Sequence, residues 1–245
     1  MHEYDLTGKV AVVTGAGRGI GSAIAIGYAR AGARVCCAAR TASEIDATVR
    51  QIEAAGGEGL AHAVDVTDRQ AVERLFEQVS RVFGGVDVLV ANAGGNMATG
   101  PIEDSDPEAW QATIAVNLLG VFYCIRAAIP CLQRRGGGTI ITLGSGMGHK
   151  GRSGHSAYCC AKAALWMLTR VSAQELWESG ISVNELIPGP VRTRATQHQG
   201  ADSVFGIQSE WVKAPEDVVP LALFLATQPA QGPTAQSFSL MRRDN

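Results

Sequence analysis

The chain has 245 residues, of which 46% are hydrophobic and 18% charged, a composition that fits one compact domain with a large apolar core. Its 21 Lys and Arg residues nearly balance 23 Asp and Glu residues, and the net charge of −2 argues against nucleic-acid and membrane partners. We therefore expect a single domain over residues 1–245 that binds a small molecule.

The N-terminal residues include two acids, Glu3 and Asp5, where a secretory signal would have basic residues followed by an apolar run. No later apolar stretch looks long enough to span a bilayer, so the expected location is the cytoplasm. The six cysteines lie within apolar segments and lack the Cys-x-x-Cys spacing of zinc and redox sites. We interpret them as reduced structural thiols.

Short runs rich in β-branched residues alternate with longer segments of helical period from Lys9 to about Gly189. This pattern is typical of repeated βαβ units around a parallel sheet. The runs are almost continuously apolar, as strands covered on both faces must be. The expected strands cover residues 10–14, 34–38, 60–64, 86–90, 139–143, 181–187 and 237–240.

Helices are expected between these runs, at residues 22–31, 42–55, 68–83, 107–132, 157–179 and 215–227. Thr67 is expected to cap the third helix, and Pro107 and Pro215 fall in first helical turns, where a missing N–H is tolerated. The predicted fold class is therefore α/β, a doubly wound, Rossmann-like parallel sheet of about seven strands with helices on both faces.

The first expected strand runs directly into a glycine-rich turn, Thr14-Gly15-Ala16-Gly17-Arg18-Gly19-Ile20-Gly21. Glycines let the backbone approach a pyrophosphate closely, and the N–H groups at the start of the next helix face its negative charge. The turn therefore predicts dinucleotide binding. A merely structural turn stays open on this motif alone, because its spacing differs from G-x-G-x-x-G.

At these residues the sequence resembles the short-chain dehydrogenase/reductase family, whose glycine motif is Thr-Gly-x-x-x-Gly-x-Gly. The resemblance covers residues 7–193 in order and approximate spacing. One departure is Ala91, where many relatives have a second Asn. The positions that carry the resemblance beyond the turn are Asp65-Val66, Asn92-Ala93-Gly94, Asn117, Ser145, Tyr158-x-x-x-Lys162, Pro188-Gly189 and Thr193.

The resemblance implies a nicotinamide dinucleotide as cofactor and a homotetramer, or a homodimer, as the assembly. The cofactor contacts that we expect come from Gly15, Gly17, Arg18, Gly19, Ile20, Gly21, Arg40, Asp65, Val66, Asn92, Ala93, Gly94, Tyr158, Lys162, Pro188, Gly189, Val191 and Thr193. Asp65 and Asn92 also admit duller interpretations, as a helix cap and a turn residue.

The residue at the end of the second strand decides between the two nicotinamide cofactors, because an acid there would bind the 2′-hydroxyl of NAD. The sequence has Ala39-Arg40 at this point, and a guanidinium can form charge-assisted bonds to a 2′-phosphate. Arg18 is a second cation on the same side. We therefore expect NADP(H), although both arginines could also be solvated surface charges.

Reduction of a ketone by hydride leaves an alkoxide that must be protonated, so the site needs an acid near the carbonyl oxygen. Tyr158 is the candidate, and Lys162 lies four residues later on the same helix face, where its charge can lower the phenol's pKa. The resemblance adds that Ser145 holds the substrate oxygen, that Lys162 binds the nicotinamide ribose and that Asn117 positions a water.

Other reactive side chains fit chemistry less well. His149 and His155 flank the same loop, but no Asp, Glu or His accompanies them at ligand spacing, so no metal site is expected. Cys159 and Cys160 lack an activating base in the sequence. Packing is their expected role.

The predicted function is an NADP(H)-dependent oxidoreductase that moves hydride between the nicotinamide and a ketone or secondary alcohol, of the carbonyl or 3-ketoacyl reductase type. Two alternatives stay open, an NAD-dependent alcohol dehydrogenase of the same family and a catalytically silent dinucleotide-binding regulator. A loop at about residues 190–213 is expected to cover the substrate, with Val204, Phe205, Ile207 and Trp211 as apolar lining.

Overall fold

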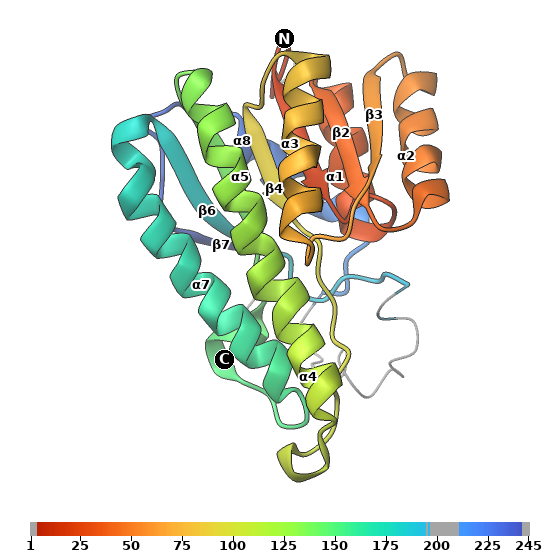
Figure 1. Ribbon diagram of the computed structural model, residues 1–245, viewed down its shortest axis with the longest axis vertical. Coiled ribbons are helices and arrows are strands. Elements are labelled where there is room, and N and C mark those ends of the chain that lie inside the picture. The colour runs from red at the N-terminus through yellow and green to blue at the C-terminus, as the bar shows by residue number, and fades with distance from the viewer. Residues whose placement is uncertain (1–3, 195, 197–210, 242–245) are drawn as a thin grey trace.

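The computed structural model describes residues 4–194, 196 and 211–241. Within these residues seven strands form one sheet in the order β3-β2-β1-β4-β5-β6-β7, and every neighbouring pair is parallel (Figure 1). The strands are β1 (Val10–Thr14), β2 (Arg34–Ala39), β3 (Glu58–Ala63), β4 (Val88–Ala91), β5 (Gly138–Leu143), β6 (Ile181–Ile187) and β7 (Ser237–Ser239). The predicted doubly wound α/β sheet is confirmed.

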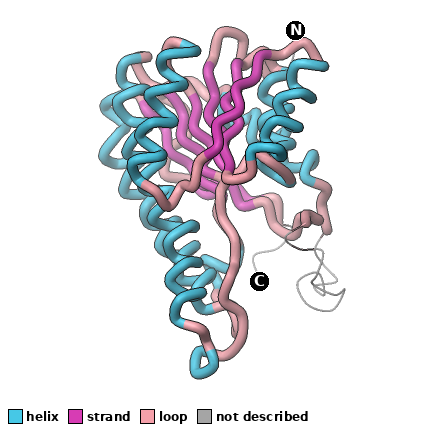
Figure 2. Tube along the Cα trace, turned by 45° about the vertical axis from the view of Figure 1, so that its right-hand side comes forward, coloured by secondary structure: helices cyan, strands magenta, loops and turns pink. Residues whose placement is uncertain are grey.

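Helices cover both faces of the sheet (Figure 2). The α-helices are α1 (Gly19–Arg30), α2 (Ala42–Ala54), α3 (Arg69–Phe83), α4 (Pro107–Ile114), α5 (Gly120–Arg134), α6 (Gly146–Lys150), α7 (Ser156–Leu176) and α8 (Val219–Ala226). Shorter turns are η1 (Ile102–Asp104), the π-helical η2 (Ala115–Leu119), η3 (Trp177–Ser179) and η4 (Pro215–Val218). Helices α3, α5 and α7 pack on one face and α1, α2 and α8 on the other.

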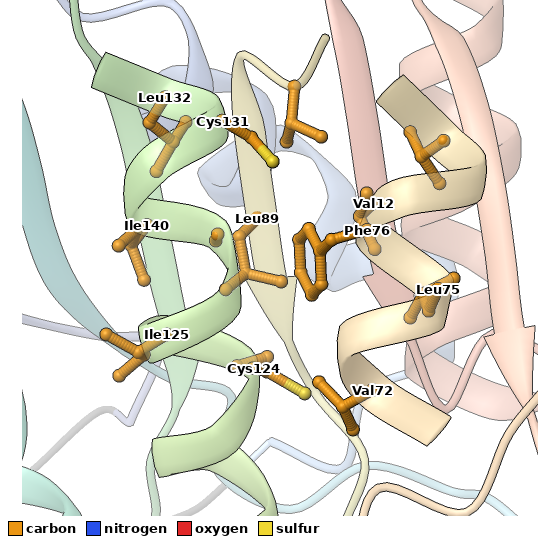
Figure 3. Packing of buried hydrophobic residues seen from close by; sticks show 14 of the residues in the cluster. Val12, Val72, Leu75, Phe76, Leu89, Cys124, Ile125, Cys131, Leu132 and Ile140 are labelled. Atoms are coloured by element: carbon orange, nitrogen blue, oxygen red, sulfur yellow. The ribbon is translucent and has the colours of Figure 1, made fainter. Parts of the chain in front are cut away.

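The two faces of the sheet bury separate apolar clusters. On the face in Figure 3, α3 and α5 lie side by side over the central strands, and Phe76 of α3 points toward Leu89 of β4. Val12 of β1 belongs to this cluster, whereas Ala11 and Val13 belong to the other, because successive side chains of a strand alternate between faces. Burial on both sides explains the nearly continuous apolar runs.

Two strands begin two residues away from the expected position. Strand β3 begins at Glu58, two residues early, because it is the sheet's edge strand and its partly exposed residues carry little apolar pattern. Strand β4 begins at Val88 and not at residue 86, because Asp87 uses its backbone and side chain to hold the start of the sheet together.

The helix cap predicted at Thr67 lies one residue later. The Asp68 carboxylate accepts hydrogen bonds from the backbone N–H groups of Gln70 and Ala71 at 2.9 and 3.0 Å. The Thr67 hydroxyl instead donates to the Asp65 carboxylate at 2.8 Å. Both side chains have capping chemistry, so the turn after β3 decides which one caps the helix.

The helix expected at residues 107–132 is interrupted by the π turn between α4 and α5. Taken together, Pro107–Arg134 is long and apolar enough by length and composition to cross a bilayer, so the expectation that no such stretch exists is wrong. Its buried residues, among them Ile125 and Leu132, pack against α3 and the sheet (Figure 3). This is the packing of a core helix.

The cysteines are free thiols that differ in burial, and Cys159 is partly buried. Cys36, Cys37, Cys124 and Cys131 are buried, and burial raises the pKa of Cys124 to about 12. Cys160 is exposed, so its interpretation as a packing residue is wrong. Helix α7 begins at Ser156, and Cys160 lies on the side of its first turns that faces solvent.

Candidate active site

The predicted site residues gather at one edge of the sheet. The glycine turn follows β1, Asn92 follows β4, Ser145 follows β5 and Pro188 follows β6. The chain winds outward in opposite directions from β1 and β4, and ligands of such sheets bind at that switch point. Figure 1 shows α4 and the first turns of α7 extending beyond the sheet at this edge.

Two turns are joined through Thr14. Its hydroxyl accepts hydrogen bonds from the backbone N–H groups of Asn92 and Ala93 at 3.0 and 3.1 Å, and the Asn92 amide donates to the Thr14 carbonyl at 2.8 Å. A Cβ on Gly21 would lie 2.4 Å from the Gly15 carbonyl oxygen, and Gly15 has a φ of +67°. Glycine is required at both positions. The start of α1 carries no side-chain cap, so its donors and shape fit a pyrophosphate.

Arg40 directly follows β2 and is exposed. Arg18 differs from expectation, because its guanidinium pairs with the Glu44 carboxylate of α2 at 2.8 Å. Arg194 lies 3.7 Å from the same carboxylate. Glu44 also lies against the glycine turn, since a Cβ on Gly17 would be 2.9 Å from the Glu44 Cβ. The glycine motif predicted that Arg18 lies near a cofactor phosphate, but it did not predict the pairing with Glu44.

Three further predicted cofactor contacts have structural partners of their own. The Asp65 carboxylate accepts from the N–H and the hydroxyl of Thr67 at 2.9 and 2.8 Å, yet the residue stays exposed. Val66 is buried against α5, where a Cβ on Gly120 would lie 2.7 Å from a Val66 methyl. Ile20 packs against the apolar cluster of the α1 face. Of these three side chains, Asp65 is exposed, Ile20 is partly buried and Val66 is buried.

Tyr158 lies on the first turn of α7 and forms a side-chain hydrogen bond with Ser145. Ser145 also caps α6, because its hydroxyl accepts from the Met147 N–H at 3.2 Å. Burial raises the pKa of Tyr158, and the hydrogen bond with Ser145 opposes that rise. The phenol is therefore protonated near neutral pH, as a proton donor must be.

Lys162 is buried one helical turn after Tyr158. Its Nζ donates to the Leu143 carbonyl at 2.6 Å and lies 5.6 Å from the centroid of the Tyr158 ring. Burial lowers the pKa of Lys162 to about 8, and the Glu185 carboxylate opposes that fall. Because burial is the largest effect, the pKa of Tyr158 lies above its usual value, and the lowering expected from Lys162 stays a prediction.

Asn117 is fully buried in the π turn. Its amide nitrogen donates to the carbonyls of Gly95 and Thr113 at 2.5 and 2.8 Å, and its oxygen accepts from the Gly95 N–H at 3.3 Å. A Cβ on Gly94 would lie 2.6 Å from the Asn117 oxygen and 3.7 Å from the Lys162 Nζ. Gly94 thus lets the loop after β4 reach Asn117 and Lys162 together.

The segment after β6 returns to the glycine turn. A Cβ on Gly19 would lie 3.3 Å from the Thr193 methyl group, and Gly189 has a φ of +67°. Val191 is buried and pairs with Lys213 in an isolated parallel bridge. Most of the expected substrate loop, including Val204, Phe205 and Ile207, lies outside the described residues.

Two polar pairs beside the site were not anticipated. The Nε2 of His149 lies 3.0 Å from a Glu185 carboxylate oxygen, and the Asn96 amide nitrogen lies 2.9 Å from Nδ1 of His155. Burial and the Arg152 charge lower the pKa of His155. The partners are 36 and 59 positions apart, so no local pattern could have paired them. Among residues 4–194, 196 and 211–241, no three His, Cys, Asp or Glu side chains form a group that could hold a metal.

Comparison with known proteins agrees with this geometry. The family model described as short chain dehydrogenase matches residues 9–203. A 3-oxoacyl-[acyl-carrier-protein] reductase of Synechocystis sp. is 37% identical over 96% of this chain and 96% of its own. A 3beta-hydroxysteroid dehydrogenase of Eggerthella lenta is 38% identical over 92% and 89% of the two chains. The crystal structure of a short-chain type dehydrogenase/reductase from Mycobacterium marinum superposes with a TM-score of 0.89 at 34% identity, covering 96% and 94% of the two chains.

Proposed function

The chain belongs to the short-chain dehydrogenase/reductase family, a family of oxidoreductases that bind a nicotinamide dinucleotide, and we propose that it is an NADP(H)-dependent carbonyl reductase. One observation carries the proposal. Tyr158, hydrogen-bonded to Ser145 and one helical turn from the buried Lys162, lies at the same sheet edge as the glycine turn. An acid, a hydrogen-bond donor and a cation are thereby assembled beside a dinucleotide cradle.

The backbone at this edge fits the dinucleotide. Gly15 and Gly21 leave room that any Cβ would fill, and the uncapped start of α1 supplies N–H donors for a pyrophosphate. Thr193 closes the same cradle from the other side, against Gly19. When bound there, the reduced nicotinamide would supply the hydride for the carbonyl carbon.

The chain's own residues would then handle the oxygen and its proton. The Ser145 hydroxyl donates a hydrogen bond to the substrate oxygen and polarises the carbonyl. The Tyr158 hydroxyl gives its proton to the oxygen as the alcohol forms. Lys162 holds a positive charge near the phenolate that remains and binds the nicotinamide ribose, while Asn117 fixes the neighbouring loop at Gly95.

The preference for NADP(H) depends on Arg40. It is exposed immediately after β2, where an acid would be needed to bind the ribose hydroxyl of NAD. Arg18 supports the preference less than its position suggests, because Glu44 already neutralises it. A 2′-phosphate would have to draw Arg18 away from that ion pair, so Arg40 is the main determinant.

The substrate proposed is a ketone of the 3-ketoacyl or cyclic type. The two relatives compared above are named for different substrates, an oxoacyl-[acyl-carrier-protein] and a hydroxysteroid. Their names therefore support both substrate types. The NAD-dependent alcohol dehydrogenase and the silent regulator remain the alternatives. Arg40 speaks against the first, and the intact pair of Tyr158 and Lys162 speaks against the second.

A panel of ketones tests this proposal. Purified protein is mixed with a 3-ketoacyl thioester, cyclic ketones and simple diketones, and oxidation of NADPH and of NADH is followed by absorbance. We expect turnover with at least one ketone and faster turnover with NADPH. Faster oxidation of NADH would favour the first alternative, and binding of cofactor with no turnover on any substrate would favour the regulator.

A cytoplasmic homotetramer, or a homodimer, completes the proposal. Apolar side chains on the outer surfaces of η2, α5 and α7 are 41–50% exposed, namely Leu119, Phe122, Met167 and Val171. Such a surface is suited to burial against a second copy of the chain. Sedimentation at micromolar concentration is expected to show a tetramer or dimer, and a monomer would refute the assembly.

A further inference from the structure

Glu185 is a buried acid that the proposed mechanism does not use. It lies in the middle of β6, between β5 and β7, and its side chain is 1% exposed. Its register partner on β5 is Thr142, whose hydroxyl is 2.8 Å from Thr169 of α7. Paired residues of parallel strands point to the same face, so Glu185 points toward α7. A carboxylate in such a place needs compensating partners.

One oxygen of this carboxylate is well occupied. The Ser237 hydroxyl donates to Oε2 at 2.5 Å, and Nε2 of His149 lies 3.0 Å from the same oxygen. The other oxygen, Oε1, has no hydrogen-bond partner within the described part of the chain. A Cβ on Gly144 would lie 1.9 Å from Oε1, so the carboxylate rests directly on the backbone beside Ser145.

The partner histidine lies on the short helix that Ser145 begins. Helix α6 runs from Gly146 to Lys150, and the His149 ring packs on Trp166 of α7 with centroids 5.3 Å apart. A Cβ on Gly148 would lie 2.8 Å from the Lys162 Cβ, so the same helix lies against the lysine. Glu185 therefore contacts the Ser145 turn at both ends, at Gly144 and at His149.

The Lys162 Nζ on α7 donates to the carbonyl of Leu143, the residue directly before Gly144, on which the Glu185 carboxylate rests. The negative charge of Glu185 raises the pKa of Lys162 and thus opposes the effect of burial. The other titratable groups of the described residues that lie around the lysine and the acid are Tyr158 on α7 and His149 on α6, and β7 contributes the neutral Ser237. Glu185 is the only acid in this set.

We propose that Glu185 is a positioning residue for the active site: its carboxylate supplies the negative charge beside Lys162 and, through His149, fixes the turn that carries Ser145. The inference rests on the proposed function for its catalytic meaning. Its physical content does not, because the charge on Lys162 exists whether or not the protein turns over a ketone.

Titration of Lys162 by NMR tests the charge directly. The chain has four lysines, Lys9, Lys150, Lys162 and Lys213, so protein labelled at lysine Cε gives few signals, and Lys162→Met assigns the relevant one. Glu185→Gln removes the charge and keeps the shape of the side chain. We expect the Lys162 midpoint to fall by about one pH unit, the size of shift that a neighbouring opposite charge produces.

Ser237→Ala is the matched control, because it removes a hydrogen bond to the same oxygen and leaves the charge in place. Its Lys162 midpoint should equal that of the wild type. If Glu185→Gln does not accumulate as folded protein, Glu185→Ser serves in its place. An unchanged midpoint in the charge-removing variant, or an equal fall in Ser237→Ala, overturns the proposal.

The second readout is the pH profile of turnover with a ketone found in the panel. Loss of the Glu185 charge should move the alkaline limb of kcat to lower pH, since Lys162 would then lose its proton earlier. His149→Gln keeps that limb in place and raises KM for the ketone, because the Ser145 turn loosens while the charge stays. An unmoved limb in Glu185→Gln contradicts the proposal, whereas a shifted NMR midpoint without any turnover would overturn the proposed function alone.

Discussion

Buried charged groups are fully paired at the edge where the strands begin, the amino edge, and less fully paired at the edge where they end, the carboxyl edge. At the amino edge, Asp87 precedes β4 and uses both carboxylate oxygens. One oxygen accepts from the Val10 N–H at 2.9 Å and from Arg135 at 3.2 Å, and the other accepts from Arg135 at 3.1 Å, with Lys9 3.8 Å away. This acid joins β1, β4 and the end of α5 into one corner of the molecule.

At the carboxyl edge the polar groups are less well satisfied. Lys162 is buried with its pKa lowered to about 8. Among the described residues, the buried Oε1 of Glu185 and Oδ1 of Asn96 have no hydrogen-bond partner. Such groups cost stability, because burial removes their hydration without full replacement.

The comparison separates stability from function. The same sheet supports both edges, so the fold itself does not force the carboxyl edge to hold poorly paired polar atoms. Proteins tolerate such costs where a site must meet a ligand. We therefore expect changes at the amino edge to lower stability without altering turnover. Changes at the carboxyl edge should mainly lower turnover.

Tyr158→Phe should give the largest effect, at the carboxyl edge. The change removes the acid and keeps the ring, so kcat should fall by roughly 10²–10⁴ while cofactor affinity stays nearly the same. Cofactor binding is read from nicotinamide fluorescence. Tyr28→Phe is the control, because its buried hydroxyl donates to the Ala222 carbonyl, far from the site, and should affect stability alone. Near-native turnover in the Tyr158 variant would exclude it as the proton donor.

Asp87→Ala should be the largest change at the amino edge. The buried Val10 N–H loses its acceptor and Arg135 loses its partner, so the free energy of unfolding should fall by about 3 kcal/mol. Denaturant titration measures this, and turnover per folded molecule should not change. Asp46→Ala, exposed on α2, should change stability by less than about 0.5 kcal/mol. A loss of kcat in folded Asp87→Ala protein would contradict the claim that the amino edge serves stability alone.

Lys162→Met should abolish most activity and change the pH dependence of stability. Because the pKa of Lys162 is about 8 when folded and higher when unfolded, the folded state binds fewer protons between these values. Wild-type stability should therefore rise relative to the variant by about 2 kcal/mol from about pH 7 to about pH 10. Below the folded pKa the variant is favoured, since it has no charge to bury. Parallel stability curves over this range would show that Lys162 is not a destabilised charge.

Arg40→Asp should have the smallest of these effects. Replacing the guanidinium by a carboxylate turns attraction for a 2′-phosphate into repulsion, so the preference for NADPH over NADH should fall at least about tenfold. Michaelis constants for both cofactors measure it. Arg81→Asp makes the same charge change in the last turn of α3 and should leave the preference unaltered. Equal discrimination in both variants would remove Arg40 from the phosphate site.

Much of the fold was predictable because its cause is local. Apolar runs predict buried strands. The glycines after β1 predict a tight turn, and Gly15 and Gly19 do have positive φ angles. The positions of Ser145, Tyr158 and Lys162 followed from their resemblance to a known motif, and the structure brings them together. The same reasoning placed the cap of α3 at Thr67, whereas the Thr67 hydroxyl is bonded to Asp65 in the turn after β3 and Asp68 caps the helix.

The remainder depended on contacts between distant segments. The pairing of Arg18 with Glu44 needs the turn of α1 and the start of α2 to meet. The raised pKa of Tyr158 reflects burial depth, which a sequence does not display. The sequence predicted only that Glu185 belongs to a strand. It lies under the Ser145 turn because β6 pairs with β5 in that register.

The central claim is that hydride passes from a nicotinamide to a carbonyl carbon at the carboxyl edge of this sheet. The most direct test uses NADPH deuterated at C4 of the nicotinamide on each face in turn, with a ketone from the panel, and mass spectrometry of the alcohol formed. The account predicts one deuterium on the carbinol carbon from one of the two labelled faces and none from the other. An alcohol that carries no deuterium with either cofactor would contradict it.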